Sequence, residues 1–259
     1  MIDDQLTFQE NDIAHMVNSA YGLVRGGDFA GAISLLERSL ELDVEYAGVT
    51  SALKSAHFWN ERKQKNQGII NEPAQGDYLL DEWTAFNRFA TRIGDLPDRC
   101  YNDFKYYVHR AALKCLLNST APAEQKFYAT ANSLQDKTTR NYYLIGHCYK
   151  VLGDYSQATA HLEKANGSYE NWPPILAELA DCYDLLKEHR AAKIFFREAF
   201  YIDPQRIEIE AIECTMMLRL SDRVVSLGRK DAELLEWIPV YGVVFGVFNV
   251  NSARDVNVF

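Results

Sequence analysis

Three carboxylates lie three residues apart in one predicted helix of this 259-residue chain, at Glu178, Asp181 and Asp184. Residues with this spacing share one face of a helix. Neighbouring carboxylates can perform acid–base catalysis or bind a hard cation. A cation site usually gathers its ligands from a tight loop or from several elements, and the sequence shows no such set. We therefore expect an acidic stripe that faces solvent or a groove, rather than a catalytic centre.

The histidines and glycines match no known reactive pattern. No two histidines form an H-x-x-x-H metal pair, and there is no G-x-S-x-G, P-loop or G-x-G-x-x-G motif. The six histidines are His15, His57, His109, His147, His161 and His189. The sequence thus predicts no catalytic residue, no metal site, no cofactor and no enzyme activity.

The cysteines and the net charge indicate which cellular compartment and which binding partners suit this protein. The five cysteines include no C-x-x-C pair, and we expect buried thiols in a reducing compartment, hence a cytoplasmic protein. A leader removed before Met1 would leave no trace in this numbering. The net charge of −9 disfavours nucleic acid, because phosphate contacts need clustered Lys and Arg. No apolar run approaches the roughly 20 residues of a membrane helix.

Residues 139–172 and 173–206 carry one pattern of small and apolar residues at an offset of 34. The corresponding positions are Tyr149 and Tyr183, Ala158 and Ala192, Leu162 and Phe196, and Ala165 and Ala199. The frame extends back to 105–138 through Ala112 and Ala131, and an isolated copy lies at 13–46. Small residues at fixed places let the two helices of a hairpin cross closely.

Two copies share a turn signal, Gly27-Asp28-Phe29 and Gly153-Asp154-Tyr155. Glycine permits the left-handed conformation that ends a helix, and aspartate caps the next one. The pattern resembles the tetratricopeptide repeat over 13–46 and 105–206. The resemblance implies an all-α right-handed superhelix, or solenoid, of helical hairpins.

The rest of the chain falls outside this frame. Residues 47–104 are too few for two repeats and predict an inserted irregular hairpin, with helices at 44–65 and 77–93 around a loop at 66–76. We thus divide the chain into 1–104, three tandem repeats at 105–206, and 207–259. In the last part we expect a capping helix over 208–220.

An apolar tail follows that capping helix. Residues Ile238 to Phe248 are β-branched, aromatic and apolar, which predicts an extended conformation. Four arrangements are open for the tail. It packs on the last helix, docks in the chain's own groove, exchanges with a second copy and so mediates self-association, or belongs to a truncated domain.

The resemblance also implies groove residues, because fixed places of each first helix line the concave face in this family. They are Tyr106, His109, Leu113 and Leu116 in 105–138, Arg140, Tyr143, His147 and Lys150 in 139–172, and Ala177, Asp181 and Asp184 in 173–206. These residues depart from the family's carboxylate clamp, so chaperone C-termini are not expected as ligands.

The charged groove residues allow two interpretations. We expect His147 to lie beside Asp181, and Lys150 beside Asp184. Either these groups pair within the protein, or a ligand competes for them, with Arg140 and Lys150 binding its acidic groups.

The family resemblance implies a non-enzymatic interaction module of scaffold, adaptor or co-chaperone type, which binds a peptide or partner domain in the groove. The alternative is an accessory subunit that binds a small apolar ligand, or assists a transporter. That alternative needs a closed cavity between 47–104 and the groove.

Overall fold

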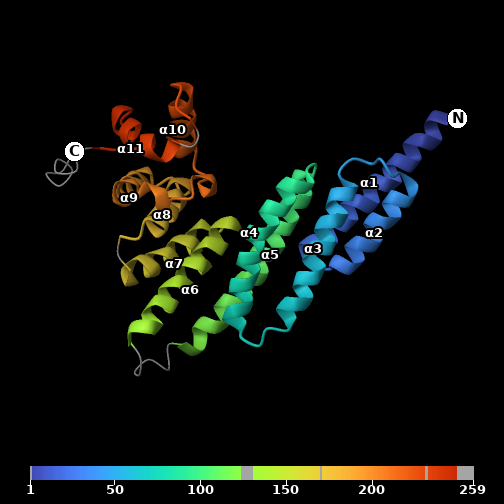
Figure 1. Cartoon of the computed structure of the whole chain (residues 1–259), viewed down its shortest axis with the longest axis horizontal. Coiled ribbons are helices and arrows are strands. Elements are labelled where there is room, and N and C mark those ends of the chain that lie inside the picture. Colours follow the sequence, from blue (N-terminus) through green and yellow to red (C-terminus); the bar gives the residue numbers. More distant parts are fainter. Residues whose placement is uncertain (1, 124–130, 170, 231–232, 250–259) are drawn as a thin grey trace. The chain divides into compact units, whose positions relative to one another are not determined.

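The computed structural model describes residues 2–123, 131–169, 171–230 and 233–249, with side chains outside 2–11 and 119–137 (Figure 1). These residues form α-helices and short 3₁₀ turns, and no strand occurs among them. The predicted all-α helical-repeat class is confirmed. The chain divides into two compact units, residues 1–124 and 125–259, which we describe separately.

The first unit contains five helices. They are α1 (Ile2–Gly26), α2 (Phe29–Leu42), α3 (Val49–Gln67), α4 (Glu72–Ile93) and α5 (Asp98–Ala123). The turn between α1 and α2 is the predicted one, since Gly27 has a φ of 80° and the side chain of Asp28 accepts a hydrogen bond from the amide of Gly31. Residues 13–46 thus form the expected hairpin.

Helices α3 and α4 form the hairpin predicted for the insertion, but α4 begins five residues earlier than expected. Asn71 accepts a hydrogen bond from the amide of Ala74, and Pro73 occupies the first turn. Asparagine followed by proline at the first helical positions is a start signal. Its aromatic face belongs to the core, because Trp83 and Phe86 pack closely against Trp59.

Residues 105–138 do not form a hairpin of their own, contrary to the predicted frame. α5 runs unbroken from Asp98 to Ala123, and α6 then runs from Ala131 to Val151. Ala112 lies at a helix crossing as expected, but the crossing helix is the preceding α4. A Cβ on Gly76 of α4 would lie 2.8 Å from Cγ of Leu116 and 3.2 Å from the carbonyl oxygen of Ala112.

The second unit contains the hairpins predicted at 139–172 and 173–206. Its elements are α6 (Ala131–Val151), α7 (Tyr155–Ser168), α8 (Pro173–Leu185), α9 (His189–Ile202), η1 (Pro204–Arg206), η2 (Ile209–Ala211), α10 (Thr215–Ser226) and α11 (Leu234–Val244). Gly153 has a φ of 85° and the side chain of Asp154 accepts from the amide of Gln157, as the turn signal requires. In the next hairpin, the residue at the position that corresponds to Gly153 is Lys187, which has a φ of 69°.

The predictions for the end of the chain are wrong in two places. The expected helix at 208–220 starts only at Thr215, after the two 3₁₀ turns. The tail expected to be extended is largely the helix α11. Burial of its apolar side chains by neighbouring helices outweighs the preference of β-branched residues for strands.

The end of α11 folds back on the helix. Gly246 has a φ of 70° and donates to the carbonyl of Val243, while Val247 donates to the carbonyl of Gly242. This Schellman arrangement places Phe248 on Gly242 and against Phe200 of α9. Of the alternatives for the tail, the structure therefore shows packing on the chain's own last helices.

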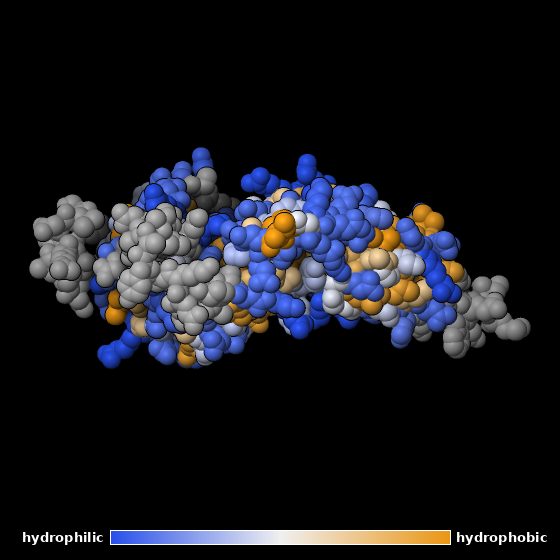
Figure 2. Space-filling view, turned by 90° about the horizontal axis from the view of Figure 1, so that it is seen from below, coloured by the Kyte–Doolittle hydropathy of each residue, from blue (hydrophilic) through white to orange (hydrophobic). Residues whose placement is uncertain are grey.

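The outer surface is mainly polar on the face drawn in Figure 2, where hydrophobic residues form smaller areas among hydrophilic ones. None of the described helices is both long enough and apolar enough to cross a membrane.

Candidate functional site

The acidic stripe of α8, which we expected to face solvent or a groove, is mostly enclosed in the second unit, where Glu178 and Asp184 each line a pocket. Glu178 is 7%, Asp181 0% and Asp184 6% exposed. A buried carboxylate is stable only when it is paired or hydrogen-bonded, and each of these three has a basic partner from another part of the chain. The stripe therefore joins elements of the fold.

Asp181 is the centre of this polar cluster. Its carboxylate lies 2.7 Å from Nζ of Lys150 and accepts hydrogen bonds from the amides of Glu213 and Cys214. Lys150, which is 2% exposed, also donates to the carbonyl of Ala211 at 2.8 Å. We call residues 207–214 the anchored segment, because α6 and α8 hold it through these bonds.

Electrostatics keep the buried cluster ionised. Burial alone would lower the pKa of Lys150, but Glu178 and Asp181 outweigh it and raise that pKa. Burial would likewise raise the pKa of Glu178, but His147 and Lys150 lower it to about 2. The pKa of His147 is raised, because Glu178 opposes the effect of burial.

The predicted pairs are displaced by one helical turn. Nδ1 of His147 lies 2.7 Å from Oε1 of Glu178, not beside Asp181. Lys150 pairs with Asp181, not with Asp184. Asp184 instead lies 2.6 Å from Nδ1 of His189 on α9. Equal places in two repeats thus do not face each other, because α6 and α8 are staggered by three residues.

This arrangement favours pairing within the protein over competition by a ligand. Lys150 is buried and bound to Asp181 and the anchored segment, so its charge is already paired, although the residue also lines a pocket between α6 and α8. Arg140 is exposed on α6. The charges of Lys150 and His147 are used within the protein.

The candidate residues on α5 belong to the first unit and are mostly core. His109, Leu113 and Leu116 are at most 8% exposed. The ring of His109 packs edge-on against Trp83, 5.4 Å away. Tyr106 is half-buried beneath the guanidinium of Arg25.

A pocket of about 220 Å³ lies between α6, α8 and the chain around the anchored segment. We call it the groove pocket, because Tyr143 and Ala177 were predicted to line the groove and do line this pocket. Most of the remaining wall of this pocket consists of Trp172, Arg206, Glu208 and Ile212. Glu178 also contributes, and its Oε2 is buried with no hydrogen-bond partner among the described residues.

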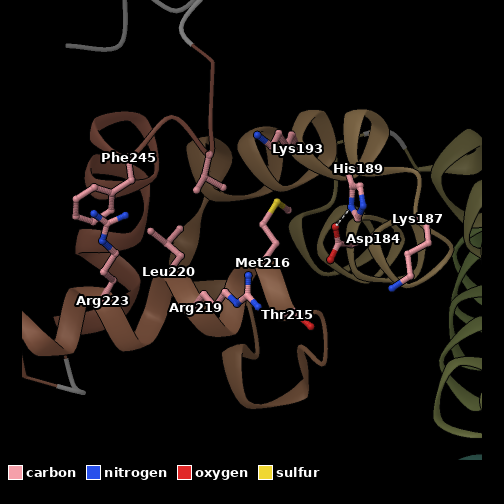
Figure 3. Close-up of a pocket in the computed structure, with 11 residues that line it drawn as sticks. Asp184, Lys187, His189, Lys193, Thr215, Met216, Arg219, Leu220, Arg223 and Phe245 are labelled. Atoms are coloured by element: carbon pink, nitrogen blue, oxygen red, sulfur yellow. Dashed lines mark hydrogen bonds and ion pairs between the residues drawn. The ribbon is translucent and has the colours of Figure 1, made fainter.

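A larger pocket of about 510 Å³ lies between the α8–α9 turn, α10 and the residues after α11 (Figure 3). We call it the basic pocket. Its cations are Lys187, Lys193, Arg219 and Arg223, and His189 also lines it. Figure 3 shows His189 and Lys193 on α9 across from Met216 and Arg219 on α10. This pocket was not predicted, although the lysine at the turn place of Gly153 was a visible signal in the sequence.

The described residues show no reactive centre of other kinds. No group of three or more His, Cys, Asp or Glu among them is arranged to hold a metal ion. The five cysteines are free, and burial raises the pKa of the Cys100 and Cys182 thiols to about 12. These thiols are therefore protonated and weakly reactive near neutral pH.

Comparison with known proteins agrees with the two hairpins of the second unit. The sequence matches the tetratricopeptide repeat family at residues 139–171 and 173–206, which lie in α6–α7 and α8–α9. The chain contains tetratricopeptide repeats. Such repeats bind protein partners, so the chain has the features of a protein–protein interaction module.

This chain is also similar to a solved structure described as "Functional Characterization of Pseudomonas Aeruginosa pilF". The two are 15% identical with a TM-score of 0.33, and the alignment covers 96% of this chain and 97% of that one. No curated protein matches the sequence.

Proposed function

We propose that this chain is a non-enzymatic scaffold or adaptor that binds a segment of a partner protein in the groove pocket. The observation that carries the proposal is the carboxylate of Glu178, because this residue lines the pocket and its buried Oε2 has no hydrogen-bond partner among the described residues. A buried acceptor left unpaired costs about 1–3 kcal/mol. A partner that donates an N–H there removes this cost.

The walls of the groove pocket define the rest of the ligand. The rings of Tyr143 and Trp172 meet edge to face with centroids 5.2 Å apart and form an apolar side. Nearby positive charges are already used, because Lys150 pairs with Asp181 and Arg206 with Asp203. The expected ligand is therefore an apolar side chain next to a lysine, an arginine or another N–H donor.

The anchored segment affects both affinity and ligand choice. Its bonds to Lys150 and Asp181 fix one wall of the groove pocket before any partner binds. Preorganisation of this kind lowers the ordering cost of binding. Because those two residues already hold the chain's own backbone, a carboxylate-clamp role typical of some co-chaperones is not part of the proposal. The free thiols fit a reducing, cytoplasmic location.

Selection from a random peptide library tests this function. Enriched peptides should carry Lys or Arg beside an apolar residue. The change Glu208→Arg reverses an exposed charge at the pocket rim and should weaken binding about fivefold or more. Glu210→Arg is the matched control, since it is exposed two residues away and does not line the pocket. No enrichment, or equal loss in both variants, would contradict the proposal.

A further inference from the structure

We propose that the basic pocket is a second binding site, which takes an acidic segment of a partner protein. A carboxylate of the segment lies between the cations of α9 and α10, and an adjacent apolar side chain contacts Met216 and Leu220. The proposal rests on the charge, shape and backbone of this pocket, and does not depend on the function of the groove pocket.

The first argument is an excess of positive charge in an acidic protein. The chain carries a net charge of −9, yet four Lys and Arg side chains line this pocket against one carboxylate. That carboxylate, Asp184, is buried and already bound to His189. Within the described residues neither Lys187 nor Arg219 has an ion-pair partner. A concave site with one sign of charge concentrates ligands of the opposite sign.

The remaining two cations are held in place without losing their charge. The guanidinium of Arg223 lies 3.9 Å from the ring centroid of Phe245. Nζ of Lys193 donates to the carbonyl of Gly246 at 3.4 Å. Both contacts leave donors available, since an ammonium has three and a guanidinium five. These side chains are therefore positioned before a ligand arrives.

The second argument comes from the backbone of Lys187. The corresponding turns of the other hairpins have glycine in the left-handed conformation, Gly27 at a φ of 80° and Gly153 at 85°. Lys187 has the same conformation at 69°. A residue with a side chain pays about 1–2 kcal/mol there. The strain is unnecessary for the turn, since glycine would avoid it, and it places a cation at the rim of the basic pocket.

The apolar floor favours a peptide over other anions. Leu220 is buried and Met216 half-buried, and both line the pocket. Methionine adapts its shape to different side chains, and the volume of about 510 Å³ is within the range of ligand sites. Nucleic acid binds through long series of phosphate contacts, which the net charge of −9 opposes. An acidic residue beside an apolar one matches both surfaces.

Apart from Asp184, the residues of the site lie outside the groove places of the repeats. The positive side chains on this side of the pocket come after the first helix of residues 173–206, beyond the places that the family's groove uses, and they include Lys187 and Lys193. A neighbouring pocket of about 350 Å³ shares Lys193 and adds Arg190 and Arg197. An extended acidic segment that enters the basic pocket therefore meets further cations along α9.

Calorimetry with the full chain and a synthetic peptide tests the proposal. The probe is acetyl-Glu-Leu-Glu-Glu-amide, and the matched peptide has Gln at each Glu. We expect measurable binding of the Glu peptide, weaker at high salt, and little binding of the Gln peptide. Arg219→Ala should weaken binding about fivefold or more. Arg206→Ala, which alters only the groove pocket, should leave it unchanged.

The change Lys187→Gly separates a binding role from a structural one. It removes a cation and relieves the left-handed strain, so stability should stay equal or rise while peptide affinity falls. Equal affinity for the Gln peptide, or unchanged affinity in both pocket variants, would overturn the proposal. Tighter binding of inorganic phosphate, a short oligonucleotide or anionic vesicles, lost in the same variants, would also overturn it in favour of another anion.

Discussion

Replacing Asp181 with Asn tests whether the buried ion pair holds the second unit together. Asp181 is fully buried and Lys150 is 2% exposed, with 2.7 Å between the charged atoms. Asparagine keeps one oxygen for the amide of Cys214, but it removes the carboxylate that contacts the ammonium and leaves only Glu178 as a nearby negative charge. Breaking a buried pair from one side costs about 3–5 kcal/mol. We expect a loss of about 4 kcal/mol in the free energy of unfolding of this unit.

A double-mutant cycle isolates the pair itself. Lys150→Met alone leaves the carboxylate of Asp181 with the amides of Glu213 and Cys214, so it should cost less, about 2–3 kcal/mol. Combining Lys150→Met with Asp181→Asn removes both buried charges. The double variant should therefore be more stable than the sum of the single losses by about 2 kcal/mol or more.

Hydrogen exchange on the full chain measures the stability of each variant in the cycle, and amides of the first unit serve as an internal control. Asp181→Asn should speed exchange of the α8 amides and, most directly, of the amides of Glu213 and Cys214. Amides of α4 belong to the other unit and should keep their rates. Additivity within about 0.5 kcal/mol, or equal acceleration in both units, would refute the reasoning.

Two further predictions concern residues of the same repeats. The pKa of Glu178 in the folded protein is about 2, below its ordinary value of 4.5. The ionised carboxylate therefore stabilises the fold by about 3 kcal/mol above pH 4.5, and this contribution is lost as the pH falls toward 2. In urea unfolding, the stability difference between wild type and Glu178→Gln should shrink over that pH range, and parallel curves would contradict this. In the same assay, Gly146→Ala should lower the free energy of unfolding by about 1–3 kcal/mol, because its Cβ would lie 2.6 Å from Cγ of Leu162. In the control variant Gly167→Ala, the new Cβ meets no atom within 4 Å, so the change should be neutral or stabilising. Equal effects of the two variants would exclude close packing as the cause.

The helical hairpins were predictable because their signals are local. Gly27 and Gly153 adopt the left-handed conformation, and the aspartate after each caps the next helix. These interactions act within four residues, so the sequence displays them in order. Offsets of 34 residues then place Ala158 and Ala192 at buried helix crossings.

The choice of partner helix was not predictable, because a small residue does not specify what packs against it. Ala112 has the same relation to Gly76 as Ala158 has to Gly146, with the glycine Cβ position near a leucine one turn later in both cases. In the frame of 34 residues, Ala112 belonged to a hairpin with the following helix. The actual partner, α4, is identified only by long-range packing.

The polar pairs were predicted wrongly because the register between α6 and α8 was wrong. Place-by-place alignment of α6 and α8 put Lys150 beside Asp184, whereas the helices are staggered and Asp181 is the partner. The basic pocket was missed for a related reason. Its cations come from the α8–α9 turn, α9 and α10, so they form no run in the sequence.

The three carboxylates of α8 explain why two pockets of different character occur on one repeat. Glu178 lines the groove pocket and Asp184 the basic pocket, six residues apart and hence about 9 Å along the helix. Between them, Asp181 holds the anchored segment across the face. If both proposed sites bind, we therefore expect recognition at the two ends of α8 rather than along one continuous groove. Loss of the Asp181 anchor should then loosen one wall of the groove pocket as well as the start of α10, which forms one side of the basic pocket.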